Sequence, residues 1–191
     1  EDEKQKQDLE YKMLQSQINP HFLYNTLNSI KWMATIQGAT GISEMTTSLS
    51  RLLKSISKGT SLLIDIREEL SLLENYFTIQ SYRYGGTITM DIQVDNESLY
   101  NSEIIKFTLQ PLVENAVQHG IHDCMETGKI RMSIHKDGDD LEITVSDNGA
   151  GMTQEMIRSV MAGKARNNGE DRYSTAVSYT HLRAHETLAN L

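Results

Sequence analysis

The sequence has a single cysteine and no long apolar run. Cys124 has no second cysteine with which to pair, so a disulfide framework within the chain is excluded, and a lone thiol fits a reducing compartment. No stretch approaches the roughly 20 apolar residues with which a helix crosses a bilayer, and no signal peptide opens the chain. We therefore expect neither a disulfide-stapled secreted domain nor a membrane span within these residues.

Basic residues are also in the minority. Lysine and arginine number 18 against 26 aspartates and glutamates, which gives a formal net charge of −8. Nucleic-acid binding draws much of its affinity from cations that neutralise phosphates, so this balance argues against nucleic acid as the main partner. The 191 residues, 38 % of them apolar, suffice for one large domain or two small ones.

The first part of the chain has the periodicity of helices. Residues 1–37 are predicted to form one helix, because apolar residues recur at steps of three and four and Gly38 can take the left-handed conformation that ends a helix. Ser43 is predicted to cap a second helix that ends near Gly59. One helical hairpin buries little apolar surface, so we expect a second copy to complete a four-helix bundle.

A third helix is predicted to begin at Asp65. The Asp65 carboxylate can cap its first turn while Glu68 reaches back as the second member of a capping box. The glycine pair Gly85 and Gly86 ends this helix and is our predicted domain boundary.

Beyond the glycine pair the periodicity becomes that of strands. Residues 87–94 alternate between apolar and polar, a helix starts or kinks at Pro111, and residues 130–145 alternate as a hairpin about a turn at 137–140. These elements predict an α+β fold in which helices cover one face of a sheet. The expected division is a helical part, 1–86, a sandwich of helices and strands, 87–176, and a tail, 177–191.

Two interpretations of His21 are open. The residue follows Pro20 within the first helix, and the helical projection places Gln17, Asn25 and Asn28 on its polar flank. His21 is either an ordinary surface histidine beside a proline kink or an exposed nucleophile. The imidazole, with an unperturbed pKa of ~6.5, would in that case be presented to a partner domain.

Asp147 also allows two interpretations. It has the same strand parity as Ile143 and Val145, so a continued strand would point its carboxylate toward the core. An unpaired buried carboxylate is costly, so the side chain either caps a turn or meets the donor of a ligand. Gly149 and Gly151 follow it and would let the backbone approach a flat or anionic ligand closely.

Glu114, Asn115 and His119 lie along the helix predicted around Pro111. Asn115 and His119 are four residues apart and are predicted to share a face at the border of the buried side. An amide oxygen there can complete the shell of a Mg²⁺ that otherwise keeps water and phosphate ligands. The alternative is a helix with an ordinary polar edge.

Three segments in this order resemble those of sensor histidine kinases, specifically the LytS/YesM-like group. They are the phosphoacceptor segment Gln17-Ile18-Asn19-Pro20-His21-Phe22-Leu23-Tyr24-Asn25-Thr26-Leu27-Asn28, the N box Pro111-Leu112-Val113-Glu114-Asn115-Ala116-Val117-Gln118-His119-Gly120, and the first glycine box Asp147-Asn148-Gly149-Ala150-Gly151-Met152. The resemblance covers roughly residues 9–160.

The resemblance implies a dimerising helical hairpin that carries the phosphoacceptor in residues 1–86. In residues 87–176 it implies the Bergerat-type ATPase sandwich that is shared with gyrase and Hsp90-like chaperones. His21 would then receive the γ-phosphoryl group of ATP, Asn115 would bind Mg²⁺ with the nucleotide, and Asp147 would accept a hydrogen bond from the adenine amino group. His119, Gly149 and Gly151 are further nucleotide-binding candidates.

Glu114 is the candidate for the base that takes the imidazole proton. Many histidine kinases outside this group have an acid directly after the phosphoacceptor, whereas Phe22 stands at that position here, so the base stays open.

The implied function is that of a homodimeric two-component kinase core, which passes its phosphoryl group to an aspartate on a response-regulator receiver domain. The core would be the cytoplasmic portion of a bacterial cell-membrane receptor, with its sensor region upstream. Two other hypotheses are a non-catalytic module that binds ATP or dimerises, as the fold kinship allows, and a scaffold that dimerises without nucleotide.

Two features of the sequence depart from this group. The second glycine box, Gly-x-Gly-Leu-x-Asn, does not follow Met152, and residues 177–191 resemble translated adapter sequence, which we exclude from fold reasoning together with His181 and His185. We therefore expect this chain itself to bind ATP weakly and to autophosphorylate little or not at all.

His119, His122 and Cys124 could suggest a metal site by residue type. Cys-x-x-Cys spacing and a fourth ligand are absent, so we expect no structural zinc.

Overall fold

The computed structural model describes residues 20–57, 61–121, 127–138, 140–149, 151 and 158. The chain divides into two compact units, residues 1–60 and residues 61–191, which are described separately below. None of the helices in the described part of the chain combines the length and the apolar character that crossing a bilayer requires.

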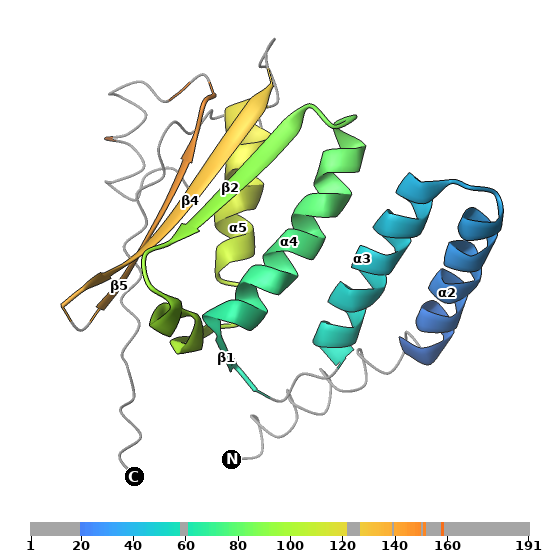
Figure 1. Cartoon of the computed structure of the whole chain (residues 1–191), viewed down its shortest axis with the longest axis horizontal. Helices are drawn as coiled ribbons and strands as arrows, with labels where there is room; N and C mark the ends of the chain where they lie inside the picture. The colour runs from blue at the N-terminus through green and yellow to red at the C-terminus, as the bar shows by residue number, and fades with distance from the viewer. Residues whose placement is uncertain are drawn as a thin grey trace. The chain divides into compact units, whose positions relative to one another are not determined.

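The first unit is a helical hairpin of α2 (Pro20–Ile36) and α3 (Thr40–Ser57), as Figure 1 shows. The predicted end of the first helix is confirmed, because Gly38 has a φ of 70°. The Ala39 N–H bonds to the Ala34 carbonyl at 2.8 Å, and the Gly38 N–H bonds to the Thr35 carbonyl at 3.2 Å. This pair of bonds is a Schellman motif, in which a left-handed residue satisfies the last carbonyls of a helix.

The prediction that Ser43 caps the second helix is wrong. The helix begins at Thr40, and the Ser43 N–H already bonds to the Ala39 carbonyl at 3.1 Å within its first turn. The Ser43 hydroxyl oxygen lies 3.3 Å from the Thr35 hydroxyl oxygen across the hairpin. The turn at Gly38 is so tight that the second helix starts at Thr40, three residues before Ser43.

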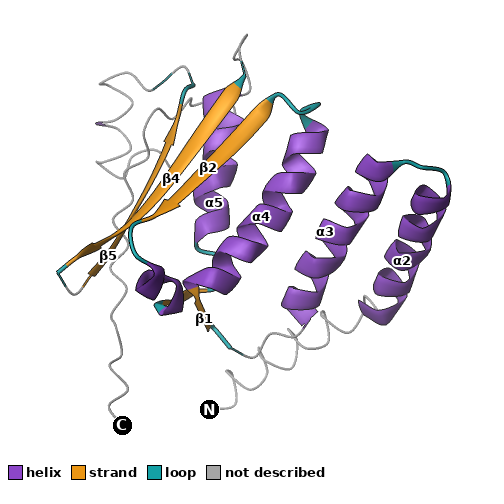
Figure 2. Ribbon diagram, in the orientation of Figure 1, coloured by secondary structure: helices purple, strands orange, loops and turns teal. Residues whose placement is uncertain are grey.

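The second unit combines short strands and helices in a sandwich. Its elements are β1 (Leu63–Asp65), α4 (Ile66–Arg83), β2 (Ile88–Val94), the 3₁₀ helix η1 (Glu97–Asn101), β3 (Glu103–Ile105), α5 (Leu109–Asn115), the π-helical turn η2 (Ala116–Ile121), β4 (Gly128–Asp137) and β5 (Asp140–Asp147). A three-stranded sheet has the order β2-β4-β5, with β2 parallel to β4 and β5 antiparallel to it, and β1 pairs with β3 separately. Figure 2 shows α4 and α5 on one face of the larger sheet.

Strand alternation builds the core between this sheet and the two helices. The predicted hairpin is confirmed, with Ile134 opposite Ile143 and Met132 opposite Val145. The core comprises apolar side chains that are less than a tenth exposed, among them Leu70, Leu73, Ile88, Leu109, Val113, Val117, Ile130, Met132, Ile134, Leu141, Ile143 and Val145. Burial of this one-sided apolar set holds the helices against the sheet.

The predicted N-cap of α4 at Asp65 is confirmed, while the reciprocal bond from the Glu68 side chain stays a prediction. Asp65 is the N-cap, and its Oδ1 accepts a hydrogen bond from the Glu68 N–H at 2.7 Å. Pro111 lies in the first turn of α5, two residues after the helix begins at Leu109. Proline is tolerated there because the first N–H groups of a helix have no acceptor within the helix.

The division between the compact units differs from the predicted boundary. Gly85 and Gly86, with φ of 63° and 77°, end α4 as predicted. The units separate at Thr60 and Ser61, so α4 belongs to the second unit. The reason is the buried apolar side of α4, including Leu73, which packs into the sandwich, whereas the glycine pair marks only the end of a helix. The sequence also did not predict β1 and β3, which have three residues each.

Candidate functional site

His21 lies on the exposed surface of α2, one residue after its described start. Its ring nitrogen Nδ1 is 3.2 Å from the Asn25 amide nitrogen, one helical turn later. Asn25 and Asn28 are exposed on the same helix, while Leu23 and Leu27 are half-buried, as the helical projection predicts. The imidazole is therefore accessible from solvent, and one of its nitrogens contacts the Asn25 amide.

The N box begins on α5 and continues into η2. Glu114 is half-buried, and its Oε1 accepts a hydrogen bond from the Gln118 side-chain amide at 2.9 Å, while Asn115 is exposed. The pKa of Tyr76 is raised to about 12, mainly by burial and next by the negative charge of the Glu114 carboxylate. Glu114 is thus close to α4 and has an amide donor that fixes its orientation.

The backbone changes from an α-helix to a π-helix immediately after Asn115. A π-helix has a wider turn than an α-helix and is frequent at functional sites. The predicted common face of Asn115 and His119 assumed α-helical spacing, which does not apply across this junction. The side chain of His119 lies outside the described residues, and His122 and Cys124 lie outside them entirely.

Asp147 is the last residue of β5 and lies on the core side of the sheet. It pairs with Ile130 of β4, which in turn pairs with Met90 of β2, so its carboxylate ends a row of otherwise apolar side chains. Oδ1 accepts a hydrogen bond from the Gly149 N–H at 2.9 Å, so the turn-capping interpretation holds. Burial raises the pKa of the Asp147 carboxyl above its ordinary value of 3.8, although this hydrogen bond opposes the shift.

The raised pKa of Asp147 also bears on a ligand. It means that one backbone hydrogen bond does not compensate the loss of water around the carboxylate. A ligand amino group would supply the additional donor. Capping the turn and accepting a hydrogen bond from a ligand donor are therefore compatible roles for this residue.

Asn148 is a residue of this turn that the sequence analysis did not single out. Its Oδ1 accepts from the Lys129 N–H at 2.6 Å, its Nδ2 donates to the Thr127 carbonyl at 3.1 Å, and its own N–H donates to the Lys129 carbonyl at 3.1 Å. These bonds fasten the turn to the start of β4. The sequence signal that could have indicated this is the Asp-Asn-Gly run after a strand, since asparagine side chains often bond to backbone in turns.

The two predicted glycines lie in the same turn. Gly149 supplies the N–H that Asp147 binds, and Gly151 has a φ of 81°, which a residue with a Cβ rarely adopts. The π-helical turn after Asn115 packs against β4 and β5. The second unit therefore brings the N box and the first glycine box to the same side of the sheet, while His21 belongs to the first unit.

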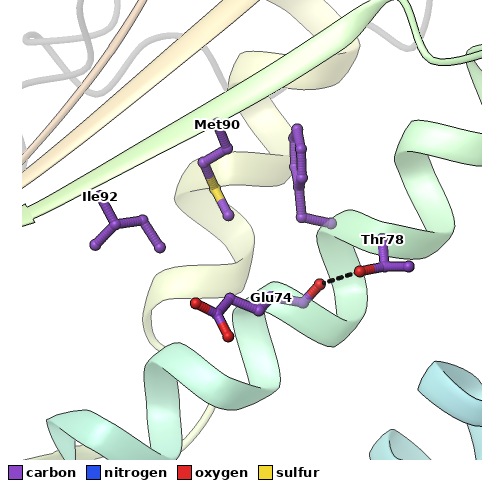
Figure 3. Close-up of a pocket in the computed structure, with 5 residues that line it drawn as sticks. Glu74, Thr78, Met90 and Ile92 are labelled. Atoms are coloured by element: carbon purple, nitrogen blue, oxygen red, sulfur yellow. Dashed lines mark hydrogen bonds between the residues drawn. The ribbon is translucent and has the colours of Figure 1, made fainter.

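A groove of about 460 Å³ on the second unit lies apart from these residues. It is lined by Glu74, Phe77 and Thr78 of α4 and by Met90 and Ile92 of β2. In Figure 3 the Thr78 hydroxyl donates to the Glu74 carbonyl, at 2.9 Å, while Met90 and Ile92 extend from the strand. Glu74 is the charged side chain of this set, so the groove has no cation for a triphosphate and does not suit a nucleotide.

Within the described residues, no group of three or more histidine, cysteine, aspartate or glutamate side chains is arranged to hold a metal ion by itself. The exposed Asn115 amide oxygen suits a Mg²⁺ that keeps most of its ligands from water and phosphate oxygens. The segment predicted to lack a second glycine box, and the tail from residue 177, lie outside the described residues.

Two family models match this chain in consecutive segments. The model described as "Histidine kinase" matches residues 9–88, and the model described as "Histidine kinase-, DNA gyrase B-, and HSP90-like ATPase" matches residues 100–186. The first match includes α4 and ends near the predicted boundary at residue 86, although α4 packs with the second unit.

Curated relatives are similar over most of the chain. The sensor histidine kinase YesM of Bacillus subtilis is 39 % identical over 80 % of this chain and 26 % of its own length. The sensor histidine kinase YpdA of Escherichia coli is 36 % identical over 83 % of this chain and 28 % of its own length. The chain therefore spans about a quarter of the length of these relatives.

Among solved structures, the catalytic domain of the histidine kinase ThkA aligns with a TM-score of 0.43 at 14 % identity, over 56 % of this chain and 68 % of that one. The two consecutive family matches and the sequence relatives agree with the order of the three motifs and with the helical hairpin followed by a sandwich. The chain belongs to the sensor histidine kinase family, in its LytS/YesM-like group.

Proposed function

We propose that this chain is the kinase core of a two-component sensor, which transfers the γ-phosphoryl group of ATP to His21 and then to an aspartate of a response regulator. The observation that carries the proposal is the partly buried Asp147 carboxylate in a turn beside the N box, in a chain that also presents an exposed histidine on a helix. Phosphoryl transfer needs mainly positioning and charge neutralisation, which this sparse set of residues can supply.

Each residue has a distinct role in this proposal. Asp147 accepts a hydrogen bond from the adenine amino group, and the turn with Gly149 and Gly151 gives the base close access to backbone. Asn115 holds Mg²⁺ on the phosphates, and Glu114 is the candidate acceptor of the imidazole proton. Mg²⁺·ATP, when bound, supplies the phosphoryl group and the charge neutralisation that these side chains do not.

The test is labelling with γ-labelled ATP and Mg²⁺. We expect little label on this chain and base-stable, acid-labile label on a repaired chain, in which a family-like second glycine box replaces residues 177–191. ATP binding without such label on the repaired chain would contradict kinase activity and support a nucleotide-binding module instead. Absence of both binding and label would leave only a dimerisation scaffold.

We further propose that the helical hairpin dimerises into a four-helix bundle. Large apolar side chains are exposed along both of its helices, namely Phe22, Ile30, Trp32, Met33, Ile36, Ile42, Leu49 and Ile56. Trp32 and Ile36 of α2 are 69 % and 81 % exposed and are one helical turn apart. An exposed apolar patch of this kind favours association, and a second hairpin of the same sequence would cover it.

The substitution Ile36→Glu tests this dimer. A charge in an apolar contact should raise the dimer dissociation constant by about tenfold or more, because the carboxylate must lose its water on association. Sedimentation velocity over a concentration series measures the shift, with Gln37→Glu, the same charge on the adjacent exposed position, as the control. Equal dissociation constants for the two variants and the parent would place the dimer contact elsewhere.

The remaining proposals concern the protein around this core. A receiver domain of a response regulator is the proposed acceptor of the phosphoryl group. The core is proposed to lie in the cytoplasm as part of a bacterial cell-membrane receptor, which is supported by the names of the sensor kinases it resembles and by the small share of their length that it spans.

A further inference from the structure

Glu69 carries a buried carboxylate that has no role in the site described above. It lies on α4 and is 1 % exposed. Its Oε2 accepts a hydrogen bond from the Phe107 N–H and its Oε1 accepts one from the Leu109 N–H, both at 2.9 Å. A buried carboxylate is costly unless it is hydrogen-bonded, and these two bonds offset part of that cost.

The backbone bends to present these two N–H groups. Phe107 has a φ of 62°, and among the described residues it is the one non-glycine residue with a positive φ. Left-handed backbone is unfavourable for a residue with a Cβ and persists where surrounding contacts enforce it. The hydrogen bonds to Glu69 are such contacts.

Leu109 is the first residue of α5 and is completely buried. Its N–H has no acceptor within the helix, so without Glu69 it would be an unsatisfied buried donor. The negative charge also lies at the positive end of the helix dipole. Burial raises the pKa of Glu69 above its ordinary 4.5, and the hydrogen bonds from Leu109 and Phe107 oppose that rise.

The same region joins the starts of the two helices. β1 and β3, which precede α4 and α5, pair with each other, and the Ile66 N–H bonds to the Ser102 carbonyl at 2.9 Å. Glu69 extends this connection by one turn, from α4 into the first turn of α5. Leu109 and Asn115 are the two ends of α5, which has seven residues, so we expect a shift of its first turn to displace Glu114 and Asn115 as well.

We propose that Glu69 is a positioning residue for the nucleotide site, whose carboxylate fixes the first turn of α5 and thereby the placement of Glu114 and Asn115 toward Mg²⁺·ATP. This inference rests on the proposed nucleotide-binding function. The competing explanation is that Glu69 adds only stability, while the burial of Leu109 and Val113 alone places the helix.

The substitution Glu69→Gln separates these explanations in this chain. Glutamine has nearly the same shape but one acceptor oxygen, so one of the two N–H groups then faces an amide NH₂. We expect amide hydrogen exchange in residues 107–118 to accelerate about tenfold, the loss that an unpaired buried donor implies, while exchange in β4 and β5 stays unchanged. We also expect the dissociation constant for Mg²⁺·ATP, from an NMR titration that tolerates weak binding, to rise about fivefold or more.

The control is Glu68→Gln, which removes an exposed carboxylate from the preceding position of the same helix. It should change neither exchange in residues 107–118 nor the ATP dissociation constant. If Glu69→Gln does not fold, Glu69→Asp keeps the charge but withdraws it by one methylene group, and the same two effects are expected. Circular dichroism identifies the folded variants.

A purely structural role would lower the unfolding temperature of the Glu69 variants and leave the ATP dissociation constant of the folded protein unchanged, which would overturn the proposal. Unchanged exchange in residues 107–118 would overturn it as well. If the unaltered chain does not bind Mg²⁺·ATP at all, the proposed nucleotide function fails and the positioning role fails with it. The comparison of amide hydrogen exchange would then show only whether Glu69 stabilises the first turn of α5.

Discussion

Replacing His21 with glutamine is expected to abolish phosphoryl labelling of the repaired chain, by more than about 1,000-fold. The reason is that glutamine keeps the length and polarity of the side chain but has no nitrogen lone pair of comparable nucleophilicity. The measurement is base-stable, acid-labile label after incubation with Mg²⁺ and γ-labelled ATP. Binding of ATP should be unaffected, because His21 belongs to the hairpin and the nucleotide candidates belong to the second unit.

The matched control for His21 is His135→Gln. His135 is a half-exposed histidine on β4, and its Nδ1 lies 2.6 Å from the Asp95 carboxylate. Its substitution should leave the label intact. Label that persists in His21→Gln and disappears in His135→Gln would reverse the assignment of the phosphoacceptor, and label lost in both would point to a general loss of folding that circular dichroism can detect.

Replacing Asp147 with asparagine is expected to weaken ATP binding by about 30- to 100-fold, the loss of a hydrogen bond to a charged acceptor in a partly buried site. The adenine edge presents an amino donor where guanine presents a carbonyl acceptor. The parent should therefore prefer ATP to GTP, and Asp147→Asn should reduce that preference, because the asparagine amide can donate to the guanine oxygen. Isothermal titration of both nucleotides measures the two effects.

The pKa of Asp147 predicts how the difference in ATP affinity between the parent and Asp147→Asn changes with pH. The ionised carboxylate is a stronger hydrogen-bond acceptor than the protonated carboxyl, and burial raises its pKa above 3.8. As pH falls through this raised pKa, the parent should lose ATP affinity and approach the Asp147→Asn variant, while at pH values above this pKa the two should differ fully. A constant difference between them at all pH values would contradict the proposed role of the ionised carboxylate.

The control for Asp147 is Asp137→Asn. Asp137 is an exposed carboxylate at the other end of the same hairpin. Its substitution makes the same change in net charge but should leave both nucleotide dissociation constants unaltered. An equal loss in both variants would mean that the effect comes from net charge and not from a contact with adenine.

Local signals predicted the elements that local chemistry builds. The cap at Asp65, the ends of two helices at glycines and the hairpin of β4 and β5 all depend on residues within a few positions of each other. The cap at Ser43 was predicted wrongly, although serine is a good capping residue. The Schellman turn at Gly38 had already started the next helix three residues earlier, and such competition between neighbouring turn signals is decided by geometry.

Contacts between distant segments account for what the sequence did not predict. Strands β1 and β3 have three residues each, too few for an alternating pattern, and form because they pair with each other. The division between the compact units follows the packing of α4 on the sheet and not the glycine pair that ends it. The π-helical turn after Asn115 likewise changes a face that α-helical spacing predicted.

By itself, the sequence determined the order of the longer helices and strands, the exposure of His21 and the position of Asp147 at the end of a core-facing strand, because periodicity and turn chemistry are local properties. Only the tertiary structure decided that Asp147 caps its own turn, that Asn148 fastens this turn to β4, and that Glu69 holds the start of α5. The partners of Glu69 lie 38 and 40 residues away along the chain. No local pattern encodes such a pairing, since it exists only once two helices have packed on the same sheet.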